Sequence, residues 1–143
     1  MANSVKDLIL VSIIGGSGYT GAELIRLVSK HPHFQLYQVV ANRNADKKIQ
    51  EIFPHLRHLN LPDFITFGQM DFDNVDLIFC ALPHATSQEI IVKIPKGKKI
   101  IDLSADFRLE SIEEYERWYG TKHIANSLQK KAVYGLTEIY KEK

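Results

Sequence analysis

Four glycines fall between Gly15 and Gly21, within the stretch IIGGSGYTGAELI. Because glycine has no side chain, such a cluster allows another molecule to come close to the main chain. Gly16, Gly18 and Gly21 follow the pattern G-x-G-x-x-G between an apolar run and a helical pattern, the context that indicates a dinucleotide-binding turn. A plain glycine-rich turn is the alternative, whereas a kinase-like phosphate loop is excluded because no Gly-Lys-Ser/Thr follows. The predicted cofactor-binding residues of this turn are Gly15, Gly16, Ser17, Gly18, Tyr19, Thr20 and Gly21.

In such a turn, the free backbone N–H groups at the helix start and the helix dipole attract the diphosphate. The end of the next strand selects the dinucleotide, since NAD is bound there by a carboxylate and NADP by a cation that meets its 2′-phosphate. This chain has Asn42 and Arg43 at that place, and its first acid, Asp46, comes later. An arginine fork suits phosphate. We therefore predict NADP(H) as the cofactor, bound by Asn42 and Arg43, with a solvated surface role for Arg43 as the alternative.

The elements that must position these residues can be predicted from hydrophobic patterns. Apolar runs rich in β-branched residues predict strands over residues 8–14, 35–41, 75–82 and 99–103, with a smaller strand over 64–67. Helical patterns run from the glycines to Val28 and recur over 47–52, 87–93 and 111–119, while 132–140 has no clear pattern. Strands alternating with helices predict an α/β fold with a doubly wound, mostly parallel sheet of the Rossmann type. Ligands of such a sheet bind where its strands end.

Composition limits the classes of protein that fit. The 143 residues include 18 basic and 17 acidic side chains, and this length fits one domain over 1–143. The scattered charges, with a net value of +1, disfavour nucleic acid and anionic membranes as partners. No apolar stretch reaches the roughly twenty residues that span a bilayer. Because Cys80 is the only cysteine, no intramolecular disulfide can form, which suits a reducing compartment. We expect a cytoplasmic protein without nucleic-acid or membrane partners.

Six stretches together resemble one family. They are GGSGYTGAELIRL, FPHLRHL, ALPHATS, IDLSADFRL, YERWYG and AVYGLTE, and they span most of the chain from Leu8 to Glu138. Together they are similar to the amino-terminal portion of N-acetyl-γ-glutamyl-phosphate reductase, and SADFR beside WYG and ALPH is more specific than the glycine pattern. The resemblance implies NADPH-dependent reduction of N-acetylglutamyl 5-phosphate, the small-molecule substrate, to its semialdehyde in arginine biosynthesis. In the family a carboxy-terminal helix covers this domain, and without it an apolar patch on the sheet would favour self-association, so we expect a homo-oligomer.

The family's chemistry requires a cysteine thiolate that attacks the acyl phosphate before hydride reduces the thioester. In the family this cysteine lies in a Pro-Gly-Cys stretch beyond the segment that AVYGLTE resembles, and a histidine acid/base lies further on. Neither motif occurs in this chain. Cys80 lies inside the apolar run IFCAL, where burial would suppress thiolate formation, so we expect it to be a core residue. The expectation is a cofactor-binding part of a longer enzyme, without its catalytic α+β domain, catalytic residues or reductase turnover of its own.

Several other residues lie at predicted strand ends. The resemblance places His84 near the nicotinamide side of the site, so Leu82, Pro83 and His84 are further predicted cofactor-binding residues, although a loop histidine bonded to the backbone fits equally. Arg108 could bind a substrate phosphate or carboxylate, or form an internal salt bridge with Asp106. No metal is expected, because His55 and His58 have no further ligands at a matching spacing. The candidate substrate-binding residues are Ser104, Asp106 and Arg108.

Two alternatives remain open at this point. A stand-alone dinucleotide-binding or sensing module would never have had a catalytic half. Another semialdehyde dehydrogenase, such as the aspartate-semialdehyde type, would share the architecture. A short-chain dehydrogenase is disfavoured, because Tyr119 and Lys122 miss the Tyr-x-x-x-Lys spacing by one residue.

Overall fold

The computed structural model describes residues 8–140, which form two compact units. Unit 1 comprises the chain up to Ala81 together with Pro95–Ile101, and unit 2 comprises Leu82–Ile94 together with the chain from Asp102 onward. The single domain expected over 1–143 stays a prediction, and each unit is described by itself. None of the helices in the described part is long and apolar enough to cross a membrane.

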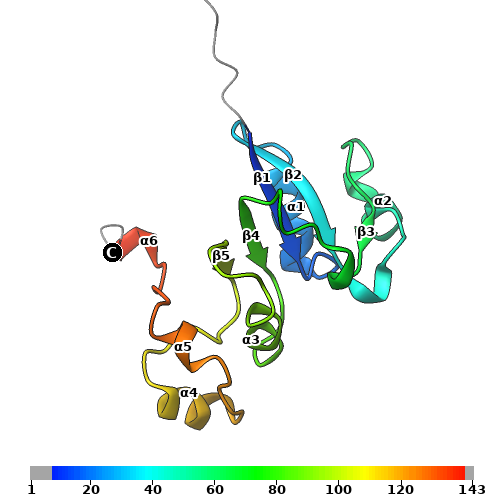
Figure 1. The fold of residues 1–143 in the computed structure, drawn as a ribbon. Helices are drawn as coiled ribbons and strands as arrows, with labels where there is room; N and C mark the ends of the chain where they lie inside the picture. Colours follow the sequence, from blue (N-terminus) through cyan, green and yellow to red (C-terminus); the bar gives the residue numbers. More distant parts are fainter. Residues whose placement is uncertain (1–7, 141–143) are drawn as a thin grey trace, which may run out of the picture. The chain divides into compact units, whose positions relative to one another are not determined.

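Unit 1 is built on a five-stranded sheet (Figure 1). The strands are β1 (Ile9–Ile14), β2 (Phe34–Val40), β3 (Phe64–Ile65), β4 (Leu77–Cys80) and β5 (Lys99–Asp102). They lie in the order β3-β2-β1-β4-β5, and β1 pairs in parallel with both β2 and β4. This order corresponds to the first five strands of the doubly wound dinucleotide-binding fold, in which the strand order reverses beside β1. The predicted fold class is confirmed.

The helix α1 (Tyr19–Val28) packs on β1 and β2, as Figure 1 shows. Its apolar residues recur at helical spacing, so Leu24, Ile25 and Val28 all face the sheet and are buried. They join a core that includes Ile13 and Phe64. The short segments η1 (Asn42–Asn44), α2 (Ile49–Ile52), η2 (Pro54–Leu56) and η3 (Phe67–Gln69) complete the unit.

Unit 2 contains four short helices, namely α3 (Thr86–Ile91), α4 (Ile112–Tyr119), α5 (Asn126–Gln129) and α6 (Thr137–Tyr140). Ser111 caps α4, because its hydroxyl oxygen accepts a hydrogen bond from the Glu114 N–H at 3.2 Å. Gly120 ends α4 with φ 62°, a left-handed conformation that glycine adopts without a steric penalty. Tyr115 is the residue of α4 that is buried, with 1% of its surface exposed.

The turn before β4 is organised by Asp71. Its carboxylate accepts hydrogen bonds from the Tyr37 hydroxyl at 2.7 Å, from the Asn74 side chain at 2.6 Å and from the Asp73 N–H at 2.9 Å. The bonds from Asn74 and Tyr37 favour the charged form and lower the pKa of Asp71 to about 2. Because the folded pKa is below the unfolded value, this contribution to stability is present above about pH 4 and is lost as the pH falls toward about 2.

We therefore expect Asp71→Asn to be destabilised relative to the wild type at pH 6, and the difference to shrink below about pH 4. Denaturant unfolding of both proteins between about pH 6 and pH 2.5 measures the two free energies. A stability difference that stays constant through this range would contradict the assignment of the low pKa to Asp71.

Candidate functional site

The glycine turn lies at the carboxyl end of β1, beside the point where the strand order reverses. Gly15 has φ 85°, a backbone conformation that L side chains rarely adopt. The N–H groups of Gly15 and Gly16 both donate to the Val40 carbonyl oxygen at 3.0 Å, which ties the turn to the end of β2. The sheet therefore brings together the glycine turn and the residues that follow β2.

Each glycine of the pattern has its own steric reason. A Cβ on Gly16 would lie 2.1 Å from Val39 Cγ1 in the core, and a Cβ on Gly21 would lie 2.6 Å from the Gly15 carbonyl oxygen. These two positions let the turn, the helix and the core pack closely. Gly18 differs, because a Cβ there would meet only the Gly15 carbonyl oxygen, at 3.9 Å. The space over Gly18 is open to an approaching molecule.

The start of α1 has unsatisfied backbone donors. Gly18 is its N-cap and provides no side-chain cap, and the first turn has no acidic residue. Among residues 8–140, no protein acceptor is within hydrogen-bond range of the N–H groups of Ser17, Tyr19, Thr20 and Gly21. A helix start with free N–H groups and the positive end of the helix dipole is an anion-binding arrangement.

The segment after β2 presents Arg43 at the position where a cation would meet a 2′-phosphate, and the exposed Lys48 follows it five residues later. Arg43 is exposed, and within the described residues its side chain forms no ion pair or hydrogen bond. Asn42 has a structural contact, since its side-chain oxygen accepts a hydrogen bond from the Phe67 N–H at 2.9 Å. Lys47 donates to the Asn44 side chain at 3.3 Å. Of Asn42, Arg43 and Lys47, Arg43 is the one whose charged group is available to a ligand.

Unit 2 brings together two of the predicted site segments. The Ala85 N–H, directly after His84, donates to the Asp106 carboxylate at 2.7 Å. His84 is exposed, and its ring lies 5.7 Å from the Tyr119 ring. Ser104 donates its hydroxyl to Asp102 at 2.5 Å and accepts from the Asp106 N–H at 3.0 Å. The Pro83–Ala85 turn and the SADF segment therefore form one hydrogen-bonded group.

Asp106 and Arg108 have different environments. Asp106 is fully buried, and its carboxylate is bonded to groups of this chain. Arg108 is exposed and lines a hollow in unit 2 together with Lys130 and Tyr134. The salt bridge between Asp106 and Arg108 that the sequence left open is not formed among the described residues. Arg108 stays a prediction as a substrate ligand.

Sequence reasoning missed the residues that support this group. Gln88 and Tyr115 are both buried, and the Tyr115 hydroxyl donates to the Asp106 carboxylate at 2.6 Å. Burial and the Asp106 carboxylate raise the pKa of Tyr115, so the hydroxyl stays protonated as a donor. The contacts join residues 9 to 36 positions apart, and no local pattern signals them.

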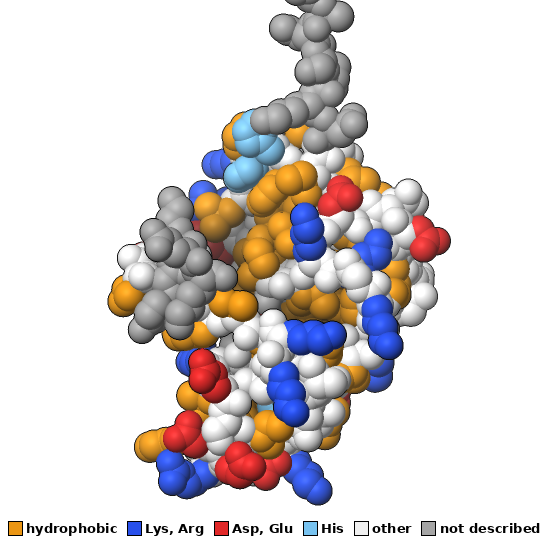
Figure 2. All heavy atoms as spheres, turned by 60° about the vertical axis from the view of Figure 1, so that its left-hand side comes forward, with side chains coloured by type: hydrophobic (Ala, Val, Ile, Leu, Met, Phe, Trp, Pro, Cys, Tyr) orange, Lys and Arg blue, Asp and Glu red, His pale blue; other side chains and the backbone are white. Residues whose placement is uncertain are grey.

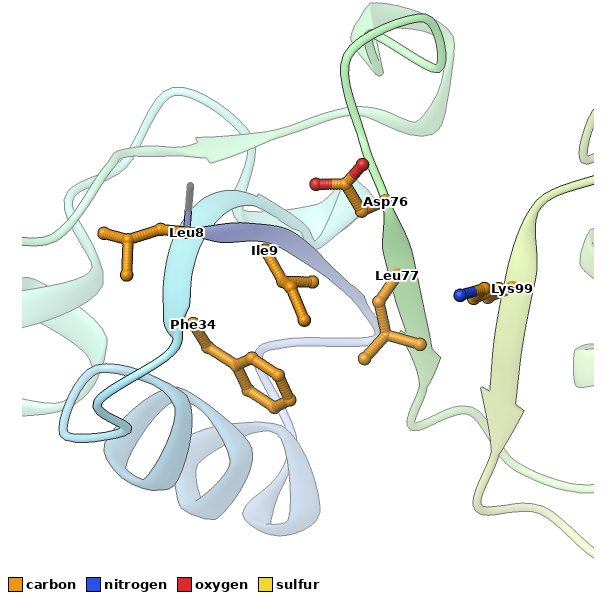
Figure 3. A pocket seen from close by; sticks show the side chains of 6 residues that line it. All are labelled: Leu8, Ile9, Phe34, Asp76, Leu77 and Lys99. Atoms are coloured by element: carbon orange, nitrogen blue, oxygen red, sulfur yellow. The ribbon is translucent and has the colours of Figure 1, made fainter. Parts of the chain in front are cut away.

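A hollow of about 480 Å³ lies at the opposite edge of the sheet (Figure 3). Its lining residues lie at the amino-terminal ends of the strands, where Phe34 begins β2 and Leu77 begins β4. Ligands of this fold bind at the carboxyl ends of the strands, so this hollow is not at the ligand-binding end of the sheet. Figure 2 shows hydrophobic side chains at the molecular surface with lysine and arginine side chains among them. No group of three or more potential metal ligands is found in the described part of the chain.

Cys80 is completely buried at the end of β4, which confirms its predicted place in the core. Replacing its sulfur by a hydroxyl puts a more polar group in an apolar site, which costs about 1–3 kcal/mol of stability. We expect Cys80→Ser to melt at a lower temperature and to bind nucleotide with unchanged affinity, as measured by calorimetry at a temperature where both proteins are folded. Weaker nucleotide binding without a lower melting temperature would overturn the assignment of Cys80 to the core.

The comparisons with known proteins agree with this geometry. Residues 10–143 match the family described as semialdehyde dehydrogenase, NAD binding domain. Relatives named N-acetyl-gamma-glutamyl-phosphate reductase include one from Rhodobacter capsulatus, 52% identical over 92% of this chain and 39% of its own length. A probable chloroplastic reductase of this name from Arabidopsis thaliana is 53% identical over 96% of this chain and 34% of its own length. The resemblance stated from the sequence motifs is confirmed, and the chain spans less than half the length of these relatives.

A solved structure of aspartate semialdehyde dehydrogenase with NADP from Candida albicans has the same fold, with a TM-score of 0.62. The likeness covers 74% of this chain and 32% of the other at 22% identity. The parallel sheet and the glycine turn agree with the family match. This chain therefore belongs to the semialdehyde dehydrogenase family and corresponds to the NAD-binding domain of that family.

Proposed function

We propose that this chain is the coenzyme-binding part of an NADP-dependent reductase that converts N-acetylglutamyl 5-phosphate to N-acetylglutamate 5-semialdehyde in arginine biosynthesis. The observation that carries the proposal is the uncapped start of α1, where free N–H groups surround the open space over Gly18. Identity of 52% and 53% to reductases of this name supports the substrate. When bound, the coenzyme supplies the hydride of the reduction.

The residues of unit 1 fit a dinucleotide. The N–H groups of Ser17, Tyr19, Thr20 and Gly21 would donate to the diphosphate, and an anion there would satisfy donors that have no acceptor among the described residues. Gly18 would allow the diphosphate to touch the main chain, because no side chain stands over it. The helix dipole of α1 favours the same negative charge.

Arg43 supports NADP over NAD. Its guanidinium is exposed and has no acidic partner among the described residues, so it would bind the 2′-phosphate with two parallel hydrogen bonds. Asp46, the first acid after β2, has its N–H bonded to the Phe64 carbonyl oxygen at 2.8 Å and a positive φ of 66°. It follows η1 and is separated from the end of the strand by five residues. The carboxylate that an NAD-binding site needs directly after the strand is therefore not provided by Asp46.

In unit 2, we propose that Leu82, Pro83 and His84 bind the nicotinamide side of the coenzyme. Arg108 is the proposed ligand of a substrate phosphate or carboxylate, because its guanidinium is exposed and no acceptor for it is found within residues 8–140. Ser104 is also proposed as a substrate ligand. Its hydroxyl donates its proton to the Asp102 carboxylate, so it would bind substrate as an acceptor. Asp106 would support these residues from the interior, since it is fully buried.

Turnover requires a nucleophile, and the only cysteine, Cys80, is completely buried. We propose that these 143 residues bind coenzyme without reducing substrate themselves. Exposed apolar side chains such as Trp118, Val133 and Tyr134 support self-association into a homo-oligomer. The balanced charge supports a protein without nucleic-acid or membrane partners, and the single cysteine suits the reducing cytoplasm.

The experiment is calorimetric titration of the 143-residue chain with NADPH, NADH and 2′,5′-ADP. We expect all three to bind at one site, with NADPH preferred to NADH by roughly tenfold or more, because NADPH engages Arg43 through its 2′-phosphate and NADH has no such group. Failure of all three ligands to bind, or equal affinity for NADPH and NADH, would contradict the proposal for the coenzyme. The substrate is tested with a longer form of the protein that carries the catalytic part. We expect this form to reduce N-acetylglutamyl 5-phosphate and not aspartyl phosphate, the substrate of the aspartate-semialdehyde type.

A further inference from the structure

The Asp106 carboxylate is the centre of a buried hydrogen-bonded group in unit 2. None of the residue is exposed, and the carboxylate accepts hydrogen bonds from the Ala85 N–H at 2.7 Å and the Gln88 N–H at 2.8 Å. The Tyr115 hydroxyl donates to it at 2.6 Å. A buried carboxylate is stable only when its oxygens are hydrogen-bonded, and these three donors meet that need.

Of these donors, Ala85 belongs to the turn that follows Pro83, and Gln88 lies in the first turn of α3. Ala85 is the N-cap of α3, with φ 67° and ψ −43°, a conformation that a residue with a Cβ rarely adopts. Its own side chain offers no hydrogen bond that could hold this conformation. The carboxylate of Asp106, from a segment 21 residues later, holds the Ala85 N–H instead.

The other side of Asp106 is fixed by His123 and Gln88. The Nε2 atom of His123 lies 2.9 Å from the Asp106 carbonyl oxygen, and its Nδ1 accepts from the Ala125 N–H at 3.3 Å. Both contacts are satisfied by a neutral ring with its proton on Nε2. The Gln88 side chain accepts from the Ile124 N–H at 2.7 Å, which links α3 to the same segment. Asp106 is therefore held both through its carboxylate and through its backbone carbonyl oxygen.

We infer that Asp106 is a positioning residue, which holds the Pro83–Ala85 turn in a single conformation through the bond to the Ala85 N–H. The inference rests on the proposed function, in which this turn binds the nicotinamide side of the coenzyme. The role differs from that of a substrate ligand, because all three bonds of the carboxylate are made to groups of this chain.

The test compares two ligands that share the adenosine part. NADPH carries the nicotinamide, whereas 2′,5′-ADP carries only the groups proposed to contact unit 1. In Asp106→Asn, an amide nitrogen replaces one acceptor oxygen, so the bond to either the Ala85 N–H or the Gln88 N–H is lost where the turn enters α3. We expect the dissociation constant for NADPH to rise by roughly fivefold and that for 2′,5′-ADP to change by less than about twofold. The nicotinamide fluorescence of bound NADPH should also shift toward the value in water.

Ser111→Ala is the matched control, because it removes the side-chain cap of α4 in the same unit and none of the hydrogen bonds to the Asp106 carboxylate. It should lower the melting temperature and leave both dissociation constants unchanged. If Asp106→Asn does not fold, Tyr115→Phe removes one donor to the carboxylate while keeping the backbone bonds, and it should weaken NADPH alone by about twofold to threefold.

Equal weakening of both ligands, or no weakening of either in a variant with a lower melting temperature, would show that Asp106 is merely structural. In both cases the wild-type chain still binds NADPH, so the proposed function survives. If the wild-type chain binds 2′,5′-ADP as tightly as NADPH, the turn makes no contact with the nicotinamide, and the inference fails for that reason instead.

Discussion

Replacing Gly21 with alanine is expected to destabilise the chain and abolish coenzyme binding. The new Cβ would lie 2.6 Å from the Gly15 carbonyl oxygen and from two backbone atoms of Gly16, closer than real Cβ contacts allow. Backbone cannot rotate away as a flexible side chain can, so α1 and the turn must separate. We expect a loss of about 1–3 kcal/mol of stability, as for other overpacked sites. Denaturant unfolding and calorimetry with NADPH measure both effects.

Two further glycines separate packing from binding. Gly68→Ala is the control, because a Cβ at Gly68 meets nothing within 4 Å and should leave both stability and binding unchanged. Gly18→Ala should also fold normally, since φ −87° and ψ 174° suit alanine. Its methyl group would occupy the space proposed for the diphosphate, so NADPH should bind tenfold more weakly or worse, on the order of 1.4 kcal/mol.

Unchanged stability in Gly21→Ala would show that the turn is looser than the distances indicate.

Arg43→Ala is expected to remove the preference for NADPH. A charge-assisted contact at this exposed position contributes about 1.5–3 kcal/mol in all, so NADPH should bind roughly 10–100-fold more weakly. NADH has no 2′-phosphate, and its affinity should change by less than about twofold. Fluorescence titration of wild type and variant with both coenzymes gives the four dissociation constants.

Arg57→Ala provides the matched control for charge. Arg57 is also exposed in unit 1, but it follows η2 and donates to the Pro54 carbonyl oxygen at 3.0 Å, away from the end of β2. Its removal changes the net charge equally, so both coenzymes should retain their affinity. Equal losses for NADPH and NADH in Arg43→Ala would refute contact with the 2′-phosphate, and a similar loss in Arg57→Ala would indicate a general effect of charge.

The elements that repeat a local pattern could be predicted from the sequence. The predicted strand 8–14 is observed as Ile9–Ile14, and the predicted strand 35–41 is observed as Phe34–Val40. Both contain apolar and β-branched residues that favour a strand, and the two strands pair with each other. The predicted strand 64–67 ends at Ile65, since Thr66 and Gln69 form a capping box that starts η3. That signal, Thr-x-x-Gln, was readable in the sequence. The strand over 75–82 is also shorter, Leu77–Cys80.

Features that depend on distant contacts could not be predicted. The positive φ of Ala85 has no signal in an alanine, because it is held by Asp106 from another part of the chain. The burial of Asp106 was missed for the same reason, since SADFR reads as a polar loop until its hydrogen bonds to Tyr115 and Gln88 are known. Spacing predicted the glycine turn better, because the close contact of Gly21 with Gly15 and Gly16 lies within one short stretch of sequence.

The most direct test of the account is a crystal structure of the chain grown with NADPH. We expect the diphosphate to lie over Gly18, with its oxygens within hydrogen-bond distance of the N–H groups of Tyr19 and Thr20, and the 2′-phosphate to meet the Arg43 guanidinium. A coenzyme whose diphosphate lies away from the Gly15–Gly21 turn, with the N–H groups of α1 still unsatisfied, would contradict the account.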